Sequence, residues 1–335
     1  MARVQEPPAQ QTPWRRRLAA WLPAAAAVGA VLLVLALLPT VLTPFWRHTL
    51  TEILILGLYA VSFGMLLSHG GLISFGHATF FGLGAYGAAL MTKRLDVALP
   101  LALGGGALTA ALAAMVIGYL CLRVGGIYFA MLTFAFQMLA YTVVVRARNL
   151  TGGTDGVAGV FPRPHLSDAQ LYYVVLGCVV VALGLLWLVS RSPFGLSLRA
   201  LRSHPARAEA VGIPVSLYKW ALFVLVGLAA GFAGALAAFV RHSVFPDGLY
   251  WTASAAPIVM ALAGGTTFLL APVVGAAAYH TLEVVIAPRF THWPLIVGGV
   301  LLLISITGRE GLVGLLSHLA RRAPRRVLWP RTGQY

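Results

Sequence analysis

The amino-acid sequence predicts an all-α fold, a polytopic bundle of about ten transmembrane helices (a range of 8–10). Of its 335 residues, 59% are hydrophobic and only 10% are charged, whereas a soluble domain carries about 25% charged residues. The apolar residues form long runs and not the alternating pattern of barrel strands, so an outer-membrane barrel is disfavoured. The cations gather at the ends of these runs, as expected for membrane helices.

Each apolar stretch is long enough, or nearly long enough, to cross a bilayer. In chain order the expected spans are 21–43, 48–68, 78–92, 97–121, 127–146, 171–190, 217–240, 254–270, 271–288 and 293–308. The split between the eighth and ninth spans depends on Pro272, which favours a helix start at that point.

Basic residues predict the orientation of the bundle, with both termini in the cytoplasm. We expect a disordered basic cytoplasmic head (1–20), a transmembrane permease domain (21–310) and a basic cytoplasmic tail (311–335). The head and tail arginines are Arg15, Arg16, Arg17, Arg321, Arg322, Arg325, Arg326 and Arg331. They are expected to touch anionic membrane lipid. The net charge of +15 does not indicate nucleic acid, because there is no exposed domain to carry a basic groove.

The loop 191–216 is predicted to be cytoplasmic and structured. One acid, Glu209, stands in or near it among five cations, Arg191, Arg199, Arg202, Arg207 and Lys219. Ser203 is expected to cap a short helix that has Pro205 in its first turn. Gly212, followed by Pro214, is expected to end this helix in the left-handed conformation. A short helix held out from the membrane is what a soluble partner needs in order to push a membrane protein.

The segment 70–87 interrupts two apolar stretches with Gly-Gly, Ser74, Gly76 and His77. Non-helical backbone at membrane depth is tolerated only against protein or a wet cavity, and broken helices often mark a translocation path. Ser74, His77 and Thr79 offer hydrogen bonds to a solute there. The alternative is that His77 only ties two helices together.

Two further interruptions follow. Leu150–Gly156 is expected to form a tight turn near the external mouth, with Asp155 on the outer face, after the polar and aromatic run Tyr128–Gln137. Ala263–Thr267, with Pro272, is expected to form a hairpin between two short spans.

Several classes of protein are disfavoured by what the chain carries. No glycine-rich loop is followed by Lys-Ser or Lys-Thr, so the chain has no P-loop. The intramembrane acids Glu52 and Glu283 lie near span ends, whereas a proton- or sodium-driven carrier usually needs ionisable groups at mid-depth. The histidines lack metal-ligand spacing, and Cys121 and Cys178 lie inside spans. We therefore expect no enzyme activity, no metal and no cofactor.

Taken together and in order, these segments resemble the permease subunits of branched-chain amino acid ABC importers, of the LivM type. The resemblance covers about 50–310 and rests on Ser74–Tyr86, Leu122–Ala130, Leu150–Gly156, Ser192–Arg202, Ala208–Ile213 and Tyr218-Lys219. It implies a multi-pass protein of the bacterial inner membrane. It also implies a homologous LivH-type permease, two cytosolic ABC ATPases that bind the ATP, and a periplasmic solute-binding protein.

Three groups of functional residues are expected, and the resemblance carries the third of them, ATPase coupling. The translocation path is assigned to Ser74, Gly76, His77, Thr79, Tyr86, Tyr128, Thr133 and Gln137. The external loop is assigned to Thr151, Gly152, Gly153 and Asp155. ATPase coupling is assigned to the segment 197–212, with Arg199, Arg202, Ala208, Glu209, Ala210 and Gly212.

Two questions stay open at this stage. Leu72 stands where many members of the family have Gln, so the solute is a branched-chain amino acid or else urea, an amide, or an aromatic or short organic acid. The rival function is a stand-alone secondary carrier or channel, which would need no partner ATPase.

Overall fold

The computed structural model describes residues 29–210 and 212–290, together with positions 292, 295, 298, 299, 311, 312 and 314. The chain divides into two compact units, Met1–Arg47 and His48–Tyr335. The predicted head lies outside the described residues, and so do nearly all of the predicted last span (293–308) and tail. Within the first unit, the described part of the first expected span forms an apolar helix, Gly29–Val41.

Long helices make up most of the second unit, and the expected spans from 48–68 to 271–288 each correspond to one of them. These helices are α2 (Pro44–Met65), α3 (His77–Leu95), α4 (Leu99–Cys121), α5 (Gly126–Arg146), α7 (Asp168–Arg191), α10 (Val215–Arg241), α11 (Trp251–Gly264) and α12 (Ala271–Ile286). Among the described residues, five helices are long and apolar enough to cross a membrane, namely α2 with its extension to Gly70, α4, α5, α7 and α10 up to Val240. The apolar helices α11 and α12 are shorter.

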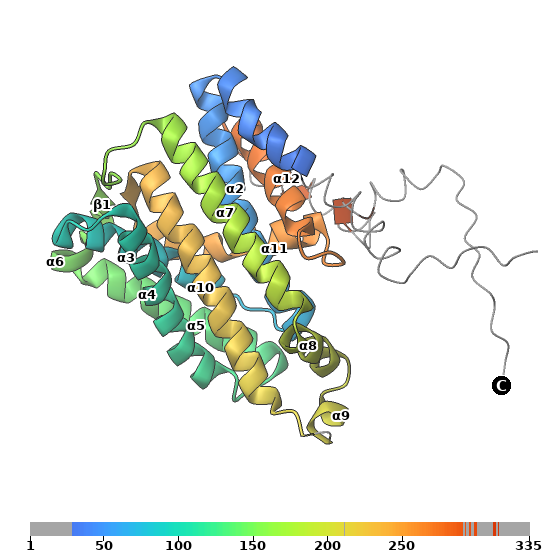
Figure 1. The fold of residues 1–335 in the computed structure, drawn as a ribbon. Helices are drawn as coiled ribbons and strands as arrows, with labels where there is room; N and C mark the ends of the chain where they lie inside the picture. The colour runs from blue at the N-terminus through green and yellow to red at the C-terminus, as the bar shows by residue number, and fades with distance from the viewer. Residues whose placement is uncertain are drawn as a thin grey trace, which may run out of the picture. The chain divides into compact units, whose positions relative to one another are not determined.

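The remaining elements lie at the two ends of α10 (Figure 1). Before α10 come α8 (Pro193–Ser203) and α9 (Pro205–Ala210). After α10 come β2 (Ser243–Val244) and the 3-10 turn η3 (Pro246–Leu249). Strand β2 pairs antiparallel with β1 (Val157–Ala158), with Val157 opposite Val244 and Ala158 opposite Ser243. Two short turns precede β1, α6 (Arg148–Thr151) and η2 (Gly153–Asp155).

Small residues allow α3, α4 and α10 to pack closely at the centre of the unit. A Cβ atom added at Gly84 of α3 would lie 2.1 Å from the carbonyl oxygen of Gly231 in α10. A Cβ added at Gly231 would lie 2.1 Å from the Cβ of Ala110 in α4. Glycine at these positions therefore lets the backbones of neighbouring helices come together.

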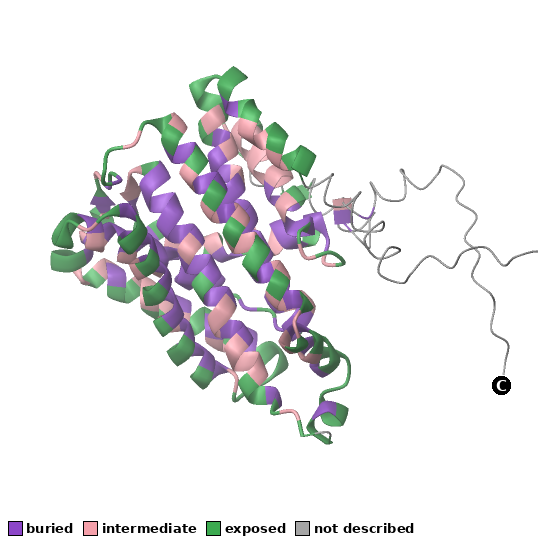
Figure 2. Ribbon diagram, viewed as in Figure 1, coloured by how far each residue is buried: buried purple, intermediate pink, exposed green. Residues whose placement is uncertain are grey.

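Burial differs between the inner and the outer helices (Figure 2). Within the most apolar window of each helix, 83% of the residues of α2 and 78% of those of α10 are buried, against 28% in both α5 and α7. The exposed residues of α5 and α7 are largely apolar, with Met131, Leu139, Val181 and Leu185 among them. Apolar exposed faces suit contact with lipid or with another transmembrane subunit.

Helices α11 and α12 form the hairpin predicted from Ala263–Thr267. Helix α11 ends at Gly264, Gly265 follows with φ 101°, and Pro272 stands in the first turn of α12. A Cβ added at Gly264 would lie 2.2 Å from the carbonyl oxygen of Ala271, and one added at Gly275 would lie 1.9 Å from that of Met260. The two helices therefore approach closely at positions where only glycine fits.

Candidate functional site

The predicted interruption is confirmed, and it lies at the start of the segment 70–87. Helix α2 continues into a π-helical turn, η1 (Leu66–Gly70), which ends at Gly71 in the left-handed conformation with φ 64°. Residues 71–76 are not helical, and α3 begins at His77. Ser74 is fully buried in this break, and its hydroxyl oxygen accepts a hydrogen bond from the backbone N–H of Gly76 at 3.2 Å.

His77 is fully buried and joins α3 to α2. Ser62 donates its hydroxyl proton to the carbonyl oxygen of Tyr59 at 2.7 Å, so its oxygen accepts from the Nε2–H of His77 at 2.9 Å. The imidazole stacks on the ring of Tyr59 and meets the rings of Phe63 and Phe80 edge-on. Its Nδ1 atom is buried, with no hydrogen-bond partner in residues 29–290 as far as these are described. The arrangement matches the alternative interpretation, in which His77 ties two helices together.

A buried polar network connects four elements beside His77. The backbone N–H of Ala78 donates to the hydroxyl of Ser254 at 3.0 Å, which in turn donates to Oε1 of Gln137 at 2.8 Å. The Nε2 amide of Gln137 donates to the carbonyl oxygens of Leu249 at 3.0 Å and Tyr250 at 2.9 Å. The start of α3 is thus linked through α5 and α11 to the turn η3.

The structure brings together most of the residues predicted for the path. Gly76 approaches α5 so closely that an added Cβ would lie 2.3 Å from the carbonyl oxygen of Thr133. Thr79 and Tyr86 lie seven residues apart on α3, and their buried hydroxyl groups have no hydrogen-bond partner among the described residues. Tyr128 is different, because its side chain is 73% exposed on an outer face of α5.

The external-loop residues form the tight turn that the sequence predicts. Thr151 donates its hydroxyl proton to the carbonyl oxygen of Val144 at 2.6 Å and accepts from the N–H of Gly153 at 3.3 Å. Gly152 and Gly153 have φ angles of 78° and 64°, which favour glycine. Asp155 is exposed at the end of the turn.

The loop 191–216 is structured as predicted, but it holds two helices where one was expected. Ser203 does not cap a helix start: it is the last residue of α8, and its hydroxyl donates to the carbonyl oxygen of Arg199 at 3.1 Å. The start of α8 is capped by Ser192, whose hydroxyl oxygen accepts a hydrogen bond from the N–H of Gly195 at 3.3 Å. The break falls at His204 because the residue before a proline is disfavoured in the helical region, and Pro205 begins α9.

The end of α9 confirms the predicted role of Gly212. Its φ angle is +86°. Its N–H donates to the carbonyl oxygen of Glu209 at 2.9 Å, and the N–H of Ile213 donates to that of Ala208 at 3.0 Å. These two bonds form a Schellman motif, in which a left-handed residue satisfies the last carbonyls of a helix. Ala208 is buried, whereas Glu209 and Ala210 are exposed.

The predicted coupling segment contacts the broken helix directly. Nη1 of Arg202 in α8 donates to the carbonyl oxygen of Ser68 in the π-helical turn at 2.7 Å. The side chain of Arg202 also covers Gly71, where an added Cβ would lie 3.2 Å from its Cγ. Arg199 donates to the carbonyl oxygen of Ser190 at 3.1 Å and so anchors α8 to the end of α7. Helix α8 therefore touches the chain at the point where α2 stops being a regular helix.

The structure shows several side-chain contacts that the sequence did not indicate. Ser62, Ser254 and Ser68 were unremarkable as single polar residues in apolar runs. Glu52 forms a two-bond ion pair with Arg241, with distances of 2.8 Å and 2.7 Å. This pair joins the start of α2 to the end of α10, and the only sequence signal for it was that each charge lies near a span end.

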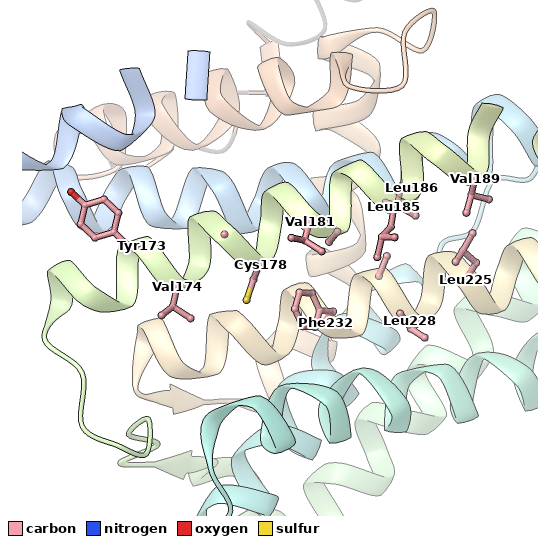
Figure 3. A pocket seen from close by; sticks show the side chains of 13 residues that line it. Tyr173, Val174, Cys178, Val181, Leu185, Leu186, Val189, Leu225, Leu228 and Phe232 are labelled. Carbon is pink, nitrogen blue, oxygen red and sulfur yellow. The ribbon is translucent and has the colours of Figure 1, made fainter. Parts of the chain in front are cut away.

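A groove of about 550 Å³ lies between α7 and α10, and its lining is apolar (Figure 3). Val181, Leu185 and Phe232 point into it, and none of the predicted path residues lines it. A polar solute finds no hydrogen-bonding side chain along most of this lining, so the groove is not a candidate solute site. Within the described residues, no group of three His, Cys, Asp or Glu side chains is placed to hold a metal ion.

The family comparison and the curated relatives point to the same kind of transport system. The family model described as branched-chain amino acid transport system / permease component matches residues 47–306. The high-affinity branched-chain amino acid transport system permease protein LivM of Escherichia coli is 25% identical over 295 residues, covering 79% of this chain and 68% of the relative. LivM of Salmonella typhimurium shows the same identity and coverage. Among solved structures, PsaBC from Streptococcus pneumoniae in complex with Fab is 18% identical with a TM-score of 0.46, covering 78% of this chain and 91% of that one.

Proposed function

This chain belongs to the family of permease components of branched-chain amino acid transport systems, and we propose that it carries branched-chain amino acids or a related small polar or organic solute. It is a permease subunit of an ABC importer and a multi-pass protein of the bacterial inner membrane. As a transport subunit it is not a catalytic enzyme, and its family implies ATPase and binding-protein partners.

The proposed assembly is this chain with a homologous LivH-type permease, two cytosolic ABC ATPases and a periplasmic solute-binding protein. ATP is bound and hydrolysed by the ATPases, and the permease itself uses no cofactor. Both termini, α8 and α9 face the cytoplasm, as the excess of arginine in these segments favours. The exposed Glu209 and Ala210 of α9 and the Schellman end at Gly212 form the docking surface for an ATPase.

The observation that carries this proposal is the hydrogen bond between Arg202 and the carbonyl oxygen of Ser68. It links the segment that an ATPase would move to the π-helical turn before the break 71–76. Movement of α8 is then passed to the turn, to Ser74 in the break, and to His77 at the start of α3. The solute responds only through a difference in its affinity for the two resulting states.

The rival function, a secondary carrier or channel, finds less support. The acid Glu52 is held by Arg241 in the third turn of α2, so its charge is already paired. Glu283 lies 3.2 Å from His280 near the end of α12. Neither carboxylate is placed at the middle of a span, where a proton- or sodium-coupled carrier usually needs one.

Uptake measurements test the substrate. Cells lacking the gene for this chain should lose high-affinity uptake of labelled leucine, isoleucine and valine, and the intact gene should restore it. Unlabelled branched-chain amino acids should compete, whereas urea, benzoate and short organic acids should not. Unchanged uptake of all three amino acids in the deleted strain, with loss of urea or organic-acid uptake, would replace the proposed substrate by one of those.

A further inference from the structure

The chain that follows α10 turns back into the bundle. Helix α10 ends at Arg241, and β2 then pairs with β1. The next turn, η3, is held by Gln137, which lies near the middle of the 21-residue helix α5. The following helix, α11, starts at Trp251 and has only 14 residues. Non-helical backbone at this depth is tolerated only against protein or a wet cavity, and Gln137 supplies the hydrogen bonds that the carbonyls of Leu249 and Tyr250 need.

Leu249 closes a hollow on α3. Its side chain is fully buried. A Cβ added at Gly82 would lie 2.3 Å from Cγ, 2.6 Å from Cδ1 and 3.2 Å from Cδ2 of Leu249. The hollow left by the missing side chain of Gly82 is therefore filled by the isobutyl group of Leu249.

Two buried hydroxyl groups lie on the same face of α3. Thr79 and Tyr86 stand three residues before and four residues after Gly82, which places all three positions on one side of the helix. Thr79 is 1% exposed and Tyr86 is 3% exposed, and neither hydroxyl oxygen has a hydrogen-bond partner in the part of the chain that the structure describes. A buried polar group without a partner is costly, so such groups need an explanation.

We infer that Pro246–Tyr250 is a gate in which Leu249 closes the solute route between α3, α5 and α11. When Leu249 withdraws, the hollow at Gly82 accepts the branched aliphatic side chain of the solute in its place. The hydroxyls of Thr79 and Tyr86 then bind the polar end of the same molecule. The inference rests on the proposed function, because it assigns a location and a ligand class to the transport path.

The chemistry of the hollow favours an aliphatic solute with a small polar end. An isobutyl group already fits against Gly82 at contact distance, and leucine carries the same group as a free amino acid. Hydroxyl groups both donate and accept hydrogen bonds, so they suit either the ammonium or the carboxylate of an amino acid. Urea would leave the hollow unfilled.

Cysteine accessibility tests the gate in the complete transporter. Cys121 and Cys178 are first replaced by alanine, and Thr79→Cys and Tyr86→Cys are introduced singly. A membrane-impermeant thiol reagent should label both slowly while Leu249 is present. Leu249→Ala should raise both labelling rates on the order of tenfold, the effect of a shift of about 1.4 kcal/mol between closed and open states. Leucine should protect the opened sites better than glycine or urea does.

Leu228→Ala is the matched control, since Leu228 lines the apolar groove between α7 and α10, away from Thr79 and Tyr86, and it should leave labelling unchanged. If Leu249→Ala does not reach the membrane, Gly82→Ala displaces the same side chain and must give the same gain. If labelling stays slow in both variants while the unmodified complex transports leucine with ATP, Leu249 is not a gate. The proposed function would be unaffected by that result. Loss of ATP-driven uptake in the unmodified complex would instead count against the proposed function itself.

Discussion

Replacing Arg202 by alanine removes the contact between α8 and the π-helical turn. The lost bond is the 2.7 Å hydrogen bond from Nη1 to the carbonyl oxygen of Ser68. A hydrogen bond to a charged group contributes about 1.5–3 kcal/mol, and the solvent exposure of Arg202 lowers this to about 1 kcal/mol. A loss of that size weakens the link between the two segments about fivefold. We therefore expect Arg202→Ala to lower the amount of solute transported per ATP hydrolysed by about that factor.

The assay compares ATP hydrolysis and solute uptake in the same proteoliposomes. Arg202→Ala should keep ATP hydrolysis while uptake falls, and Arg202→Lys should lie between this variant and the unmodified chain. Arg146→Ala is the control, because Arg146 is exposed at the end of α5, outside the coupling segment, and makes no hydrogen bond or ion pair within the described residues. A normal ratio of transport to hydrolysis in Arg202→Ala, at normal abundance in the membrane, would refute the reasoning.

Three further variants test other parts of the account. Gly84→Ala should destabilise the fold by about 1–3 kcal/mol through overpacking and so lower the yield of folded protein. Gly104→Ala is the control, because Gly104 has open space around it, and its yield should not fall. Equal yields of the two variants would contradict the close packing. Arg241→Gln should destabilise the fold by about 3 kcal/mol, because Glu52 is left buried without its partner. Adding Glu52→Gln should restore most of the lost melting temperature. No recovery in the double variant would argue against the ion pair as the cause. Gly212→Pro should abolish coupling while the protein still inserts, because proline cannot adopt φ +86° and lacks the N–H that bonds Glu209, and normal uptake would exclude a role for this helix end.

Local sequence patterns were enough to predict most of the described helices and the breaks between them. The expected span 127–146 corresponds to Gly126–Arg146, since a glycine pair and an arginine bound a continuous apolar run. The stop at Gly212 could be predicted because only glycine commonly takes the left-handed conformation there. The error at Ser203 has a local cause too: Ser192 and Pro193 start a helix earlier, and the chain reaches Ser203 while still helical.

Contacts between distant parts of the chain could not be predicted from one sequence. Glu52 and Arg241 are 189 residues apart, and Ala78 and Ser254 are 176 apart, so no spacing rule connects them. The return of η3 into the bundle was missed because residues 241–254 look like an ordinary external loop. One sequence feature did indicate this return. The apolar run after Trp251 is short for a membrane span, so another segment has to cross part of the membrane thickness.

The central claim is that this chain is the permease of an ATP-driven importer. The most direct measurement is uptake of labelled leucine into proteoliposomes that contain this chain with its partner permease and ATPases, supplied with the binding protein on the opposite side from ATP. The account predicts accumulation against a gradient that requires ATP and stops when the ATPase is inactivated, and it predicts no ATP hydrolysis by this chain alone. Accumulation by the isolated chain, driven by a proton or sodium gradient without any ATPase, would contradict it.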